Sequence, residues 1–266
     1  MNRRRHPIRV LARLVWMGEI FCVSAADFLF SRAGRSKETR GFWLQRTASR
    51  FLPLFGIQPH VKGAIPTRGL LVSNHLSYMD IVVLASLTPA VFVAKREVRS
   101  WPLFGWFATM GGSLYVNRAR RTQVGEFAAA IQTELDRGAL VILFPEGTSS
   151  GGQNVLPFKS SLLEPAARDT HPLAAGLIQY QLDDGDVSEE VCYWKDMTLL
   201  PHLLNLLSKR RVGVEVRFAP VEKISTDRKE VAQQLHTEVL RLRERSLPAE
   251  GFSPTLQTIG QSKLVD

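Results

Sequence analysis

Residues 69–84 read GLLVSNHLSYMDIVVL, and this stretch indicates an α/β fold. The apolar run 69–72 predicts a buried strand, and the apolar run 81–84 predicts a helix. The polar residues between them occupy a strand-to-helix turn, which is where α/β sheets place their functional groups.

The turn contains His75 and, five residues later, Asp80. His75 is the side chain of the turn that suits proton transfer near neutral pH. Asp80 at this spacing can hold the imidazole in one tautomer and stabilise its charged form. A structural alternative is a capping box, with Ser77 as the N-cap and Asp80 at the third helical position. The pair alone leaves both interpretations open.

The composition places the chain among ordinary globular proteins with one basic segment. Its 266 residues suit one α/β domain plus an appendage, and its two cysteines, Cys22 and Cys192, form no disulfide or zinc pattern. Residues 1–50 hold 11 Lys and Arg against 3 Asp and Glu, so this segment carries +8 of the net charge of +9. Because the segment is also apolar, we expect an anionic membrane surface as partner, on the cytoplasmic side, and no nucleic acid.

Residues 8–30 predict an amphipathic helix that lies in the membrane interface. No uncharged run reaches the 18 or so residues of an ordinary transmembrane helix. On a helical wheel the charged residues fall within an arc of about 120°; they are Arg9, Arg13, Glu19 and Asp27. The other side is apolar and holds Leu11, Leu14, Val15, Met17, Phe21 and Phe28. A spanning helix and a helix packed on the protein's own core are the alternatives, and a signal peptide is disfavoured by the charges.

The rest of the chain predicts a largely parallel sheet flanked by helices. We expect strands at 70–73, 91–94, 113–116, 140–144, 173–180 and 212–218. We expect helices at 39–54, 79–86, 101–110, 122–137, 158–168, 199–207 and 228–245. Three regions follow from this pattern: membrane-associated helices at 1–55, an α/β domain at 56–246 and a loose tail at 247–266 that contains Pro248 and Gly251.

Further candidate site residues come directly after predicted strands. Lys95 and Arg118 each follow a strand, and Glu146-Gly147-Thr148 follows another. Because the carboxyl ends of parallel strands share one edge, we expect these residues to meet His75 in one cleft. Taken singly, each cation also fits a solvated surface charge, and Glu146-Gly147 fits an ordinary turn.

Four sequence blocks in order resemble the glycerolipid acyltransferase family, of the kind that acylates 1-acylglycerol-3-phosphate. They are NHLSYMD at 74–80, GSLYVNR at 112–118, FPEGT at 144–148 and PLAA at 172–175. The resemblance covers residues 60–220 and includes KRE at 95–97, PLFG at 102–105 and PFKS at 157–160.

The resemblance implies transfer of a fatty acyl group from acyl-CoA or acyl-carrier protein to a lysolipid hydroxyl, in phospholipid biosynthesis and without a metal or redox cofactor. His75 is then the general base, supported by Asp80, because a hydroxyl attacks poorly unless its proton is removed. Arg118 binds an anionic head group, and Lys95 or backbone amides near Glu146 stabilise the oxyanion. Glu146, Gly147 and Thr148 shape the acceptor site.

Two departures from the family pattern bear on the acceptor. Ser149 replaces the arginine that usually follows the third block, and Asn117 replaces an aspartate that often precedes the arginine of the second block. Loss of that arginine favours a less charged head group than a phosphate monoester, such as that of lyso-ornithine lipid, unless Lys159 restores the charge. A non-catalytic membrane- or nucleic-acid-binding protein on the same fold is the alternative of another class.

Overall fold

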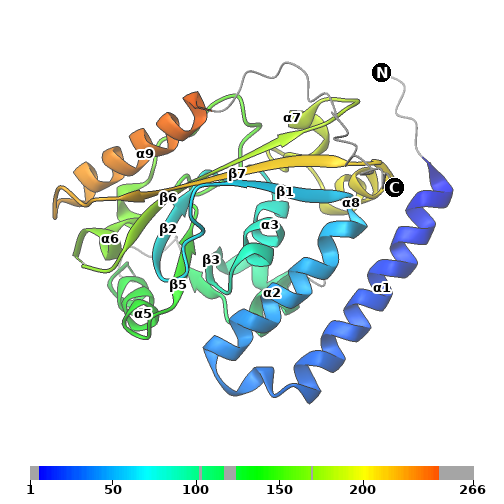
Figure 1. The fold of residues 1–266 in the computed structure, drawn as a ribbon, viewed down its shortest axis with the longest axis horizontal. Coiled ribbons are helices and arrows are strands. Elements are labelled where there is room, and N and C mark those ends of the chain that lie inside the picture. Colours follow the sequence, from blue (N-terminus) through cyan, green and yellow to red (C-terminus); the bar gives the residue numbers. More distant parts are fainter. Residues whose placement is uncertain (1–5, 102–103, 117–123, 169, 246–266) are drawn as a thin grey trace, which may run out of the picture.

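A seven-stranded sheet forms the centre of the protein in the computed structural model, which describes residues 6–101, 104–116, 124–168 and 170–245 (Figure 1). The strand order is β1-β7-β6-β2-β5-β3-β4. The strands are β1 (Ile57–Lys62), β2 (Gly69–Ser73), β3 (Val91–Lys95), β4 (Leu114–Val116), β5 (Leu140–Leu143), β6 (Leu173–Gln181) and β7 (Val212–Val221).

Neighbouring strands pair in parallel except β6 and β7, which are antiparallel. The predicted α/β class with a largely parallel sheet is therefore confirmed. All five residues of β2 are buried between β5 and β6, as its uninterrupted apolar sequence requires. Strand β1 was not predicted, because only Ile57 of its six residues is buried and Pro59 interrupts it. Such a sequence is tolerated only at a sheet edge, which is where β1 lies.

Helices cover both faces of the sheet, each over its own apolar cluster. One face carries α1 (Pro7–Phe30), α2 (Lys37–Leu54), α3 (Met79–Leu87), α4 (Phe104–Met110) and α8 (Leu199–Ser208). The other carries α5 (Val124–Asp136), α6 (Glu164–Arg168) and α9 (Arg228–Glu244) (Figure 1). The short helix α7 (Val187–Glu190) was not predicted.

The helix predicted at 158–168 is interrupted. The chain forms a short 3₁₀ turn, η4 (Ser160–Leu162), followed by α6. Pro165 is the second residue of α6, and proline is tolerated in a first helical turn but not inside a helix, because it lacks an amide hydrogen. A second helix therefore starts here instead of continuing the first.

The N-terminal helices share the core of the sheet. Trp43 on α2 is fully buried, and its indole N–H donates to the carbonyl of Ser24 on α1 at 2.8 Å. Its ring stacks on Phe107 of α4, with centroids 5.5 Å apart. Ile20 and Leu54 are buried in the same cluster. One flank of this helical pair thus packs as core, which was the alternative to a purely interfacial helix.

The polar residues of α1 also face the protein. Arg9 and Arg13 donate to the carbonyls of Ser208 and Leu207 at 2.9 and 3.1 Å, at the carboxyl end of α8. These carbonyls lack partners within their own helix, so the arginines satisfy them. Asp27 accepts hydrogen bonds from arginines of α2. The charged side of the predicted amphipathic helix therefore faces the protein at these three residues.

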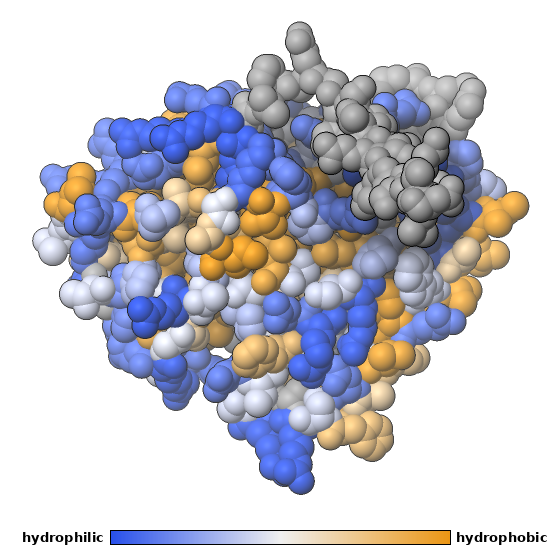
Figure 2. Space-filling view, in the orientation of Figure 1, coloured by the Kyte–Doolittle hydropathy of each residue, from blue (hydrophilic) through white to orange (hydrophobic). Residues whose placement is uncertain are grey.

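The surface of α1 that faces away from the protein is apolar instead. Of the charged residues of α1, all of which the structure describes, Glu19 alone is exposed. Figure 2 shows hydrophobic atoms along the edge of the molecule where α1 runs. The large exposed apolar residues are Ile8, Leu11, Val15, Trp16, Val23, Leu29 and Phe30. No helix among the described residues has both the length and the apolar character to cross a membrane.

Two sequence predictions fall outside the described residues. They are the position of Arg118 and the loose tail at 247–266. The division of the chain at residues 55 and 56 stays a prediction.

Candidate active site

The His75 turn begins where β2 ends. The side-chain amide of Asn74 donates to the carbonyl of Ile178 at 3.0 Å and accepts from the N–H of Ile178 at 2.8 Å. These two hydrogen bonds extend the pairing between β2 and β6 by one residue beyond the end of β2. The chain is thereby fixed just before His75.

Asp80 gathers four hydrogen-bond donors although it is fully buried. One carboxylate oxygen, Oδ2, accepts from His75 Nδ1 at 2.8 Å and from the amides of Leu76 and Ser77 at 2.6 and 3.0 Å. The other, Oδ1, accepts from the hydroxyl of Tyr180 at 2.7 Å. Both oxygens are thus satisfied, as a buried carboxylate requires. The Ser77 hydroxyl has no hydrogen-bond partner among the described residues, so only one of the two capping-box hydrogen bonds is formed, from the Ser77 amide to Asp80.

His75 is held from behind and presented to a cavity. With Nδ1 donating to Asp80, the ring nitrogen Nε2 is the one available to a substrate. The imidazole stacks on Phe144, with centroids 4.3 Å apart and an interplanar angle of 18°. Its side chain is 20% exposed. This arrangement fixes both the tautomer and the direction of the imidazole.

Glu146 joins two loops from a buried position. Its oxygens accept from the backbone amides of His75 at 3.0 Å and Leu156 at 3.3 Å. Burial raises the pKa of Glu146, the two amide hydrogen bonds lower it, and the charge of Asp80 raises it; together they bring the pKa to about 7. Glu146 therefore orders the loops around His75 from behind the cavity wall.

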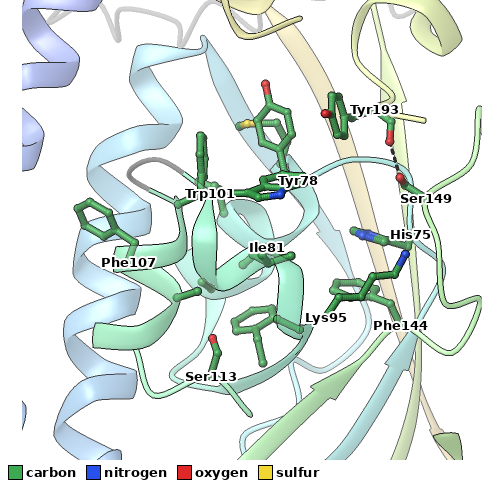
Figure 3. A pocket seen from close by; sticks show the side chains of 18 of the residues that line it. His75, Tyr78, Ile81, Lys95, Trp101, Phe107, Ser113, Phe144, Ser149 and Tyr193 are labelled. Carbon is green, nitrogen blue, oxygen red and sulfur yellow. Dashed lines mark hydrogen bonds between the residues drawn. The ribbon is translucent and has the colours of Figure 1, made fainter. Parts of the chain in front are cut away.

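A cavity of about 420 Å³ opens beside His75, within the range of small-molecule sites. Figure 3 shows His75, Lys95 and Phe144 grouped at one side and Phe107 at the other. The apolar part is lined by residues of α1, α2, α3 and α4, among them Phe21, Leu44, Phe51, Met79 and Phe107. The N-terminal helices therefore form part of the site.

The structure brings most of the predicted site residues together. His75, Lys95, Gly147 and Thr148 line the cavity, while Asp80 and Glu146 lie buried behind its wall. The amide of Gly147 already donates to the carbonyl of Phe144 at 3.2 Å, so the turn itself uses it.

Sequence reasoning missed two contributions. Tyr180, on β6, reaches Asp80 from a residue 100 positions away in the chain. Tyr193, Trp194 and Lys195 line the cavity from a loop beyond α7. Neither carries a motif; the only signal for Tyr180 was its place in a predicted strand.

Comparisons with known proteins agree with the motifs. A family model described as Acyltransferase matches residues 57–175. The lyso-ornithine lipid O-acyltransferase of Rhizobium meliloti strain 1021 is 33% identical over an alignment of 244 residues that covers 80% of this chain and 83% of that protein. The 1-acyl-sn-glycerol-3-phosphate acyltransferase of Neisseria gonorrhoeae is 30% identical over 156 residues, 59% of this chain and 61% of that protein.

One solved structure supports the fold alone. It is the crystal structure of the 1-acyl-sn-glycerophosphate acyltransferase PlsC from Thermotoga maritima, with a TM-score of 0.56 and 21% identity. The match covers 90% of this chain and 100% of that one. Together the comparisons confirm the resemblance that the sequence blocks indicated.

Proposed function

The chain belongs to the acyltransferase family, and we propose that it transfers a fatty acyl group from a thioester to the hydroxyl of a lysolipid. The observation that carries this proposal is the His75–Asp80 pair at 2.8 Å, at the wall of a largely apolar cavity. The relatives reported above are named lysolipid O-acyltransferases. A non-catalytic role would not explain why a buried carboxylate fixes His75 with its second ring nitrogen available at the cavity.

His75 acts as the general base in the proposed reaction. Nε2 takes the proton of the acceptor hydroxyl while its oxygen attacks the thioester carbonyl. The imidazolium that forms is stabilised by Asp80. The tetrahedral intermediate then collapses, the carbon–sulfur bond breaks, and His75 returns the proton to the leaving thiolate. Acyl-CoA or acyl-carrier protein supplies the thioester.

Lys95 is our candidate for stabilising the oxyanion. It lines the cavity together with His75, and a cation is suited to the negative charge that develops on the carbonyl oxygen. The backbone amide of Gly147 is the weaker candidate, because it is engaged within its own turn.

The apolar part of the cavity suits a fatty acyl chain. Its lining by Phe21, Phe51 and Phe107 offers hydrocarbon contacts and excludes water from the reacting carbonyl. We therefore place an acyl chain between the N-terminal helices and the sheet, with its carbonyl near His75.

The acceptor that the site favours is lyso-ornithine lipid. Ser149 occupies the position of the family's usual arginine, and its hydroxyl donates to the carbonyl of Tyr193. The site thus lacks one guanidinium that would bind a phosphate monoester with two hydrogen bonds. The second candidate is 1-acylglycerol-3-phosphate, which the Neisseria relative's name favours.

We further propose that α1 attaches the protein to an anionic membrane without spanning it. Its outward surface exposes Leu11, Val15 and Phe30, which are 65%, 59% and 85% exposed. Arg32 and Arg35 are exposed just beyond its last residue. A contiguous apolar surface beside cations suits an anionic bilayer.

Acyl transfer is tested by measuring thiol release from acyl-CoA and acyl-carrier protein with a panel of lysolipid acceptors. We expect turnover with lyso-ornithine lipid in the wild type and a loss of roughly 10²- to 10⁴-fold in His75→Ala. His60→Ala, at an exposed histidine of β1, is the matched control. Near-wild-type turnover in His75→Ala would refute the mechanism, and no transfer to any acceptor would favour a non-catalytic protein.

Membrane attachment is tested by co-sedimentation with phosphatidylglycerol vesicles. Deleting α1 and α2 would remove Trp43 from the core, so the double variant Leu11→Glu, Val15→Glu is the sharper probe. We expect it to lose binding. Ile224→Glu, at an apolar residue that is 76% exposed elsewhere, should bind as the wild type does. Equal binding by all three proteins would exclude α1 as the attachment surface.

A further inference from the structure

Residues 193–195 form part of the cavity wall, and none of the sequence blocks predicted this position for them. All three residues of this segment line the cavity that His75 and Lys95 also line. The segment lies between α7 and α8, outside the stretch that the family model matches. The position of the segment is set by its tertiary contacts. The same contacts determine which of its groups face the cavity.

Two of these contacts tie the segment to the loops that carry His75 and Ser149. The amide of Tyr193 donates to the carbonyl of Leu76, beside His75, at 2.8 Å. The carbonyl of Tyr193 accepts from the hydroxyl of Ser149 (Figure 3). Both backbone groups of this residue are thus engaged. The indole N–H of Trp194 adds a third tie, to the carbonyl of Ser188 at 2.9 Å.

The stretch after the third block is shaped to receive Trp194. A Cβ atom on Gly151 would lie 2.6 Å from the Trp194 ring, which is closer than any real contact. Glycine is therefore required for this packing. Ser149 and Gly151 both lie within three residues after the third block, and both contact the 193–195 segment.

Lys195 is the charged group that this arrangement delivers. Its backbone has φ of +53°, in the left-handed region that residues other than glycine seldom adopt. Its ammonium lies 3.8 Å from the centre of the Trp194 ring. An aromatic face attracts a cation without accepting all three of its N–H groups, so the ammonium can still donate to an anion. Strained conformations of this kind concentrate at functional sites.

We propose that Lys195 binds the carboxylate of the acceptor head group and so determines acceptor specificity. The inference rests on the proposed acyl transfer and deepens it. An amino acid acylated at its α-nitrogen, as in lyso-ornithine lipid, keeps a free monoanionic carboxylate. A single ammonium matches that charge, whereas a phosphate dianion favours paired guanidinium donors. Lys195 thus brings a cation into the cavity from the segment that Ser149 contacts, where the family's arginine is missing.

The test compares lyso-ornithine lipid with its carboxylate methyl ester in four proteins: wild type, Lys195→Gln, Lys195→Arg and Lys229→Gln. Lys229 is an exposed lysine of α9 and serves as the matched control. In the wild type we expect the ester to have a KM about tenfold above that of the free acid. Lys195→Gln should raise the KM of the free acid about tenfold, change kcat less than twofold and abolish the difference between acid and ester. Lys195→Arg should retain most of the discrimination.

Several outcomes would overturn the proposal. An unchanged KM in Lys195→Gln excludes a role of Lys195 in binding the acceptor. An equal loss of kcat with the acid and the ester shows that Lys195 has a merely structural role. A wild type that prefers 1-acylglycerol-3-phosphate, with a KM that responds to Lys195, excludes the carboxylate as the ligand.

A binding titration that needs no turnover separates this inference from the proposed function. Tryptophan fluorescence should report lyso-ornithine lipid at Trp194, beneath Lys195. Binding that depends on Lys195 but leads to no acyl transfer would uphold the subsite and refute the proposed function. Acyl transfer together with binding that does not depend on Lys195 would uphold the proposed function and refute the Lys195 subsite.

Discussion

The two sides of the cavity are constructed differently. The side formed by the His75 turn and Glu146 is buried, and its carboxylates are satisfied by backbone amides within a few residues or across neighbouring strands. The side formed by residues 193–195 is more exposed and is held by single hydrogen bonds to Leu76, Ser149 and Ser188. The first side suits a fixed reaction, and the second suits recognition that varies among relatives.

This difference has an energetic basis. A buried carboxylate that loses a donor leaves an unsatisfied charge, so the His75 side tolerates little change. A loop held at its backbone can exchange its side chains without disturbing that network. Substitutions on the two sides should therefore have unequal consequences.

Asp80→Asn should have the largest effect among the substitutions that probe this comparison. The amide offers one acceptor oxygen where four donors converge, and its NH₂ group faces donors. We expect turnover to fall at least roughly a hundredfold, less completely than in His75→Ala, because the imidazole remains. Steady-state kinetics measures this loss, and circular dichroism checks the fold. Retained turnover would show that Asp80 does not orient His75.

Glu146→Gln should change how stability depends on pH. Burial raises the pKa of Glu146 from 4.5 to about 7, so the folded protein keeps a proton that the unfolded chain releases. The free energy of unfolding therefore falls as pH rises from about 4.5 to about 7, by up to about 3 kcal/mol, and is level above that window. Glutamine does not ionise and should remove this contribution. Urea unfolding at pH 5 and pH 8 gives the comparison; identical pH dependence in both proteins would contradict the assignment.

Tyr180→Phe removes one donor from the buried Asp80 carboxylate. The lost hydrogen bond of 2.7 Å joins a hydroxyl to a charged group, so we expect the free energy of unfolding to fall by about 2 kcal/mol. Tyr115→Phe is the control, because the hydroxyl of Tyr115 bonds the neutral Thr109 at 2.8 Å. Thermal or urea denaturation measures both. Equal losses in the two variants would mean that the charge of Asp80 does not matter.

Ser149→Ala should have the smallest effect and should act on the acceptor alone. It removes the hydroxyl that holds the carbonyl of Tyr193. A neutral hydrogen bond contributes about 1 kcal/mol, so we expect the acceptor KM to rise about fivefold while kcat stays within twofold. Steady-state kinetics at varied acceptor concentration measures both constants. A large fall in kcat would show that the two sides of the cavity are not separable.

Much of the fold was readable because local sequence and burial agree. The predicted strands and helices that alternate after residue 69 follow from apolar runs, and residues 69–73 form a central buried strand as their composition requires. Prediction failed where local signals were weak. Strand β1 is polar and half-exposed, and a new helix with Pro165 in its first turn begins within an apparently continuous pattern. The partners of the α1 arginines could not be predicted, because they lie on α8, 194 or more residues away.

The sequence by itself determined the chemistry of the site. The residues of the His-x4-Asp turn lie five positions apart, so the turn alone brings them together. Only the tertiary structure decided what surrounds that pair. Tyr180 reaches Asp80 from 100 residues away, the N-terminal helices wall the cavity, and Lys195 enters it because Ser149, Gly151 and Leu76 fix a distant loop. Contacts between residues so far apart in the chain leave no periodic or spaced pattern, since nothing in local backbone geometry relates their positions.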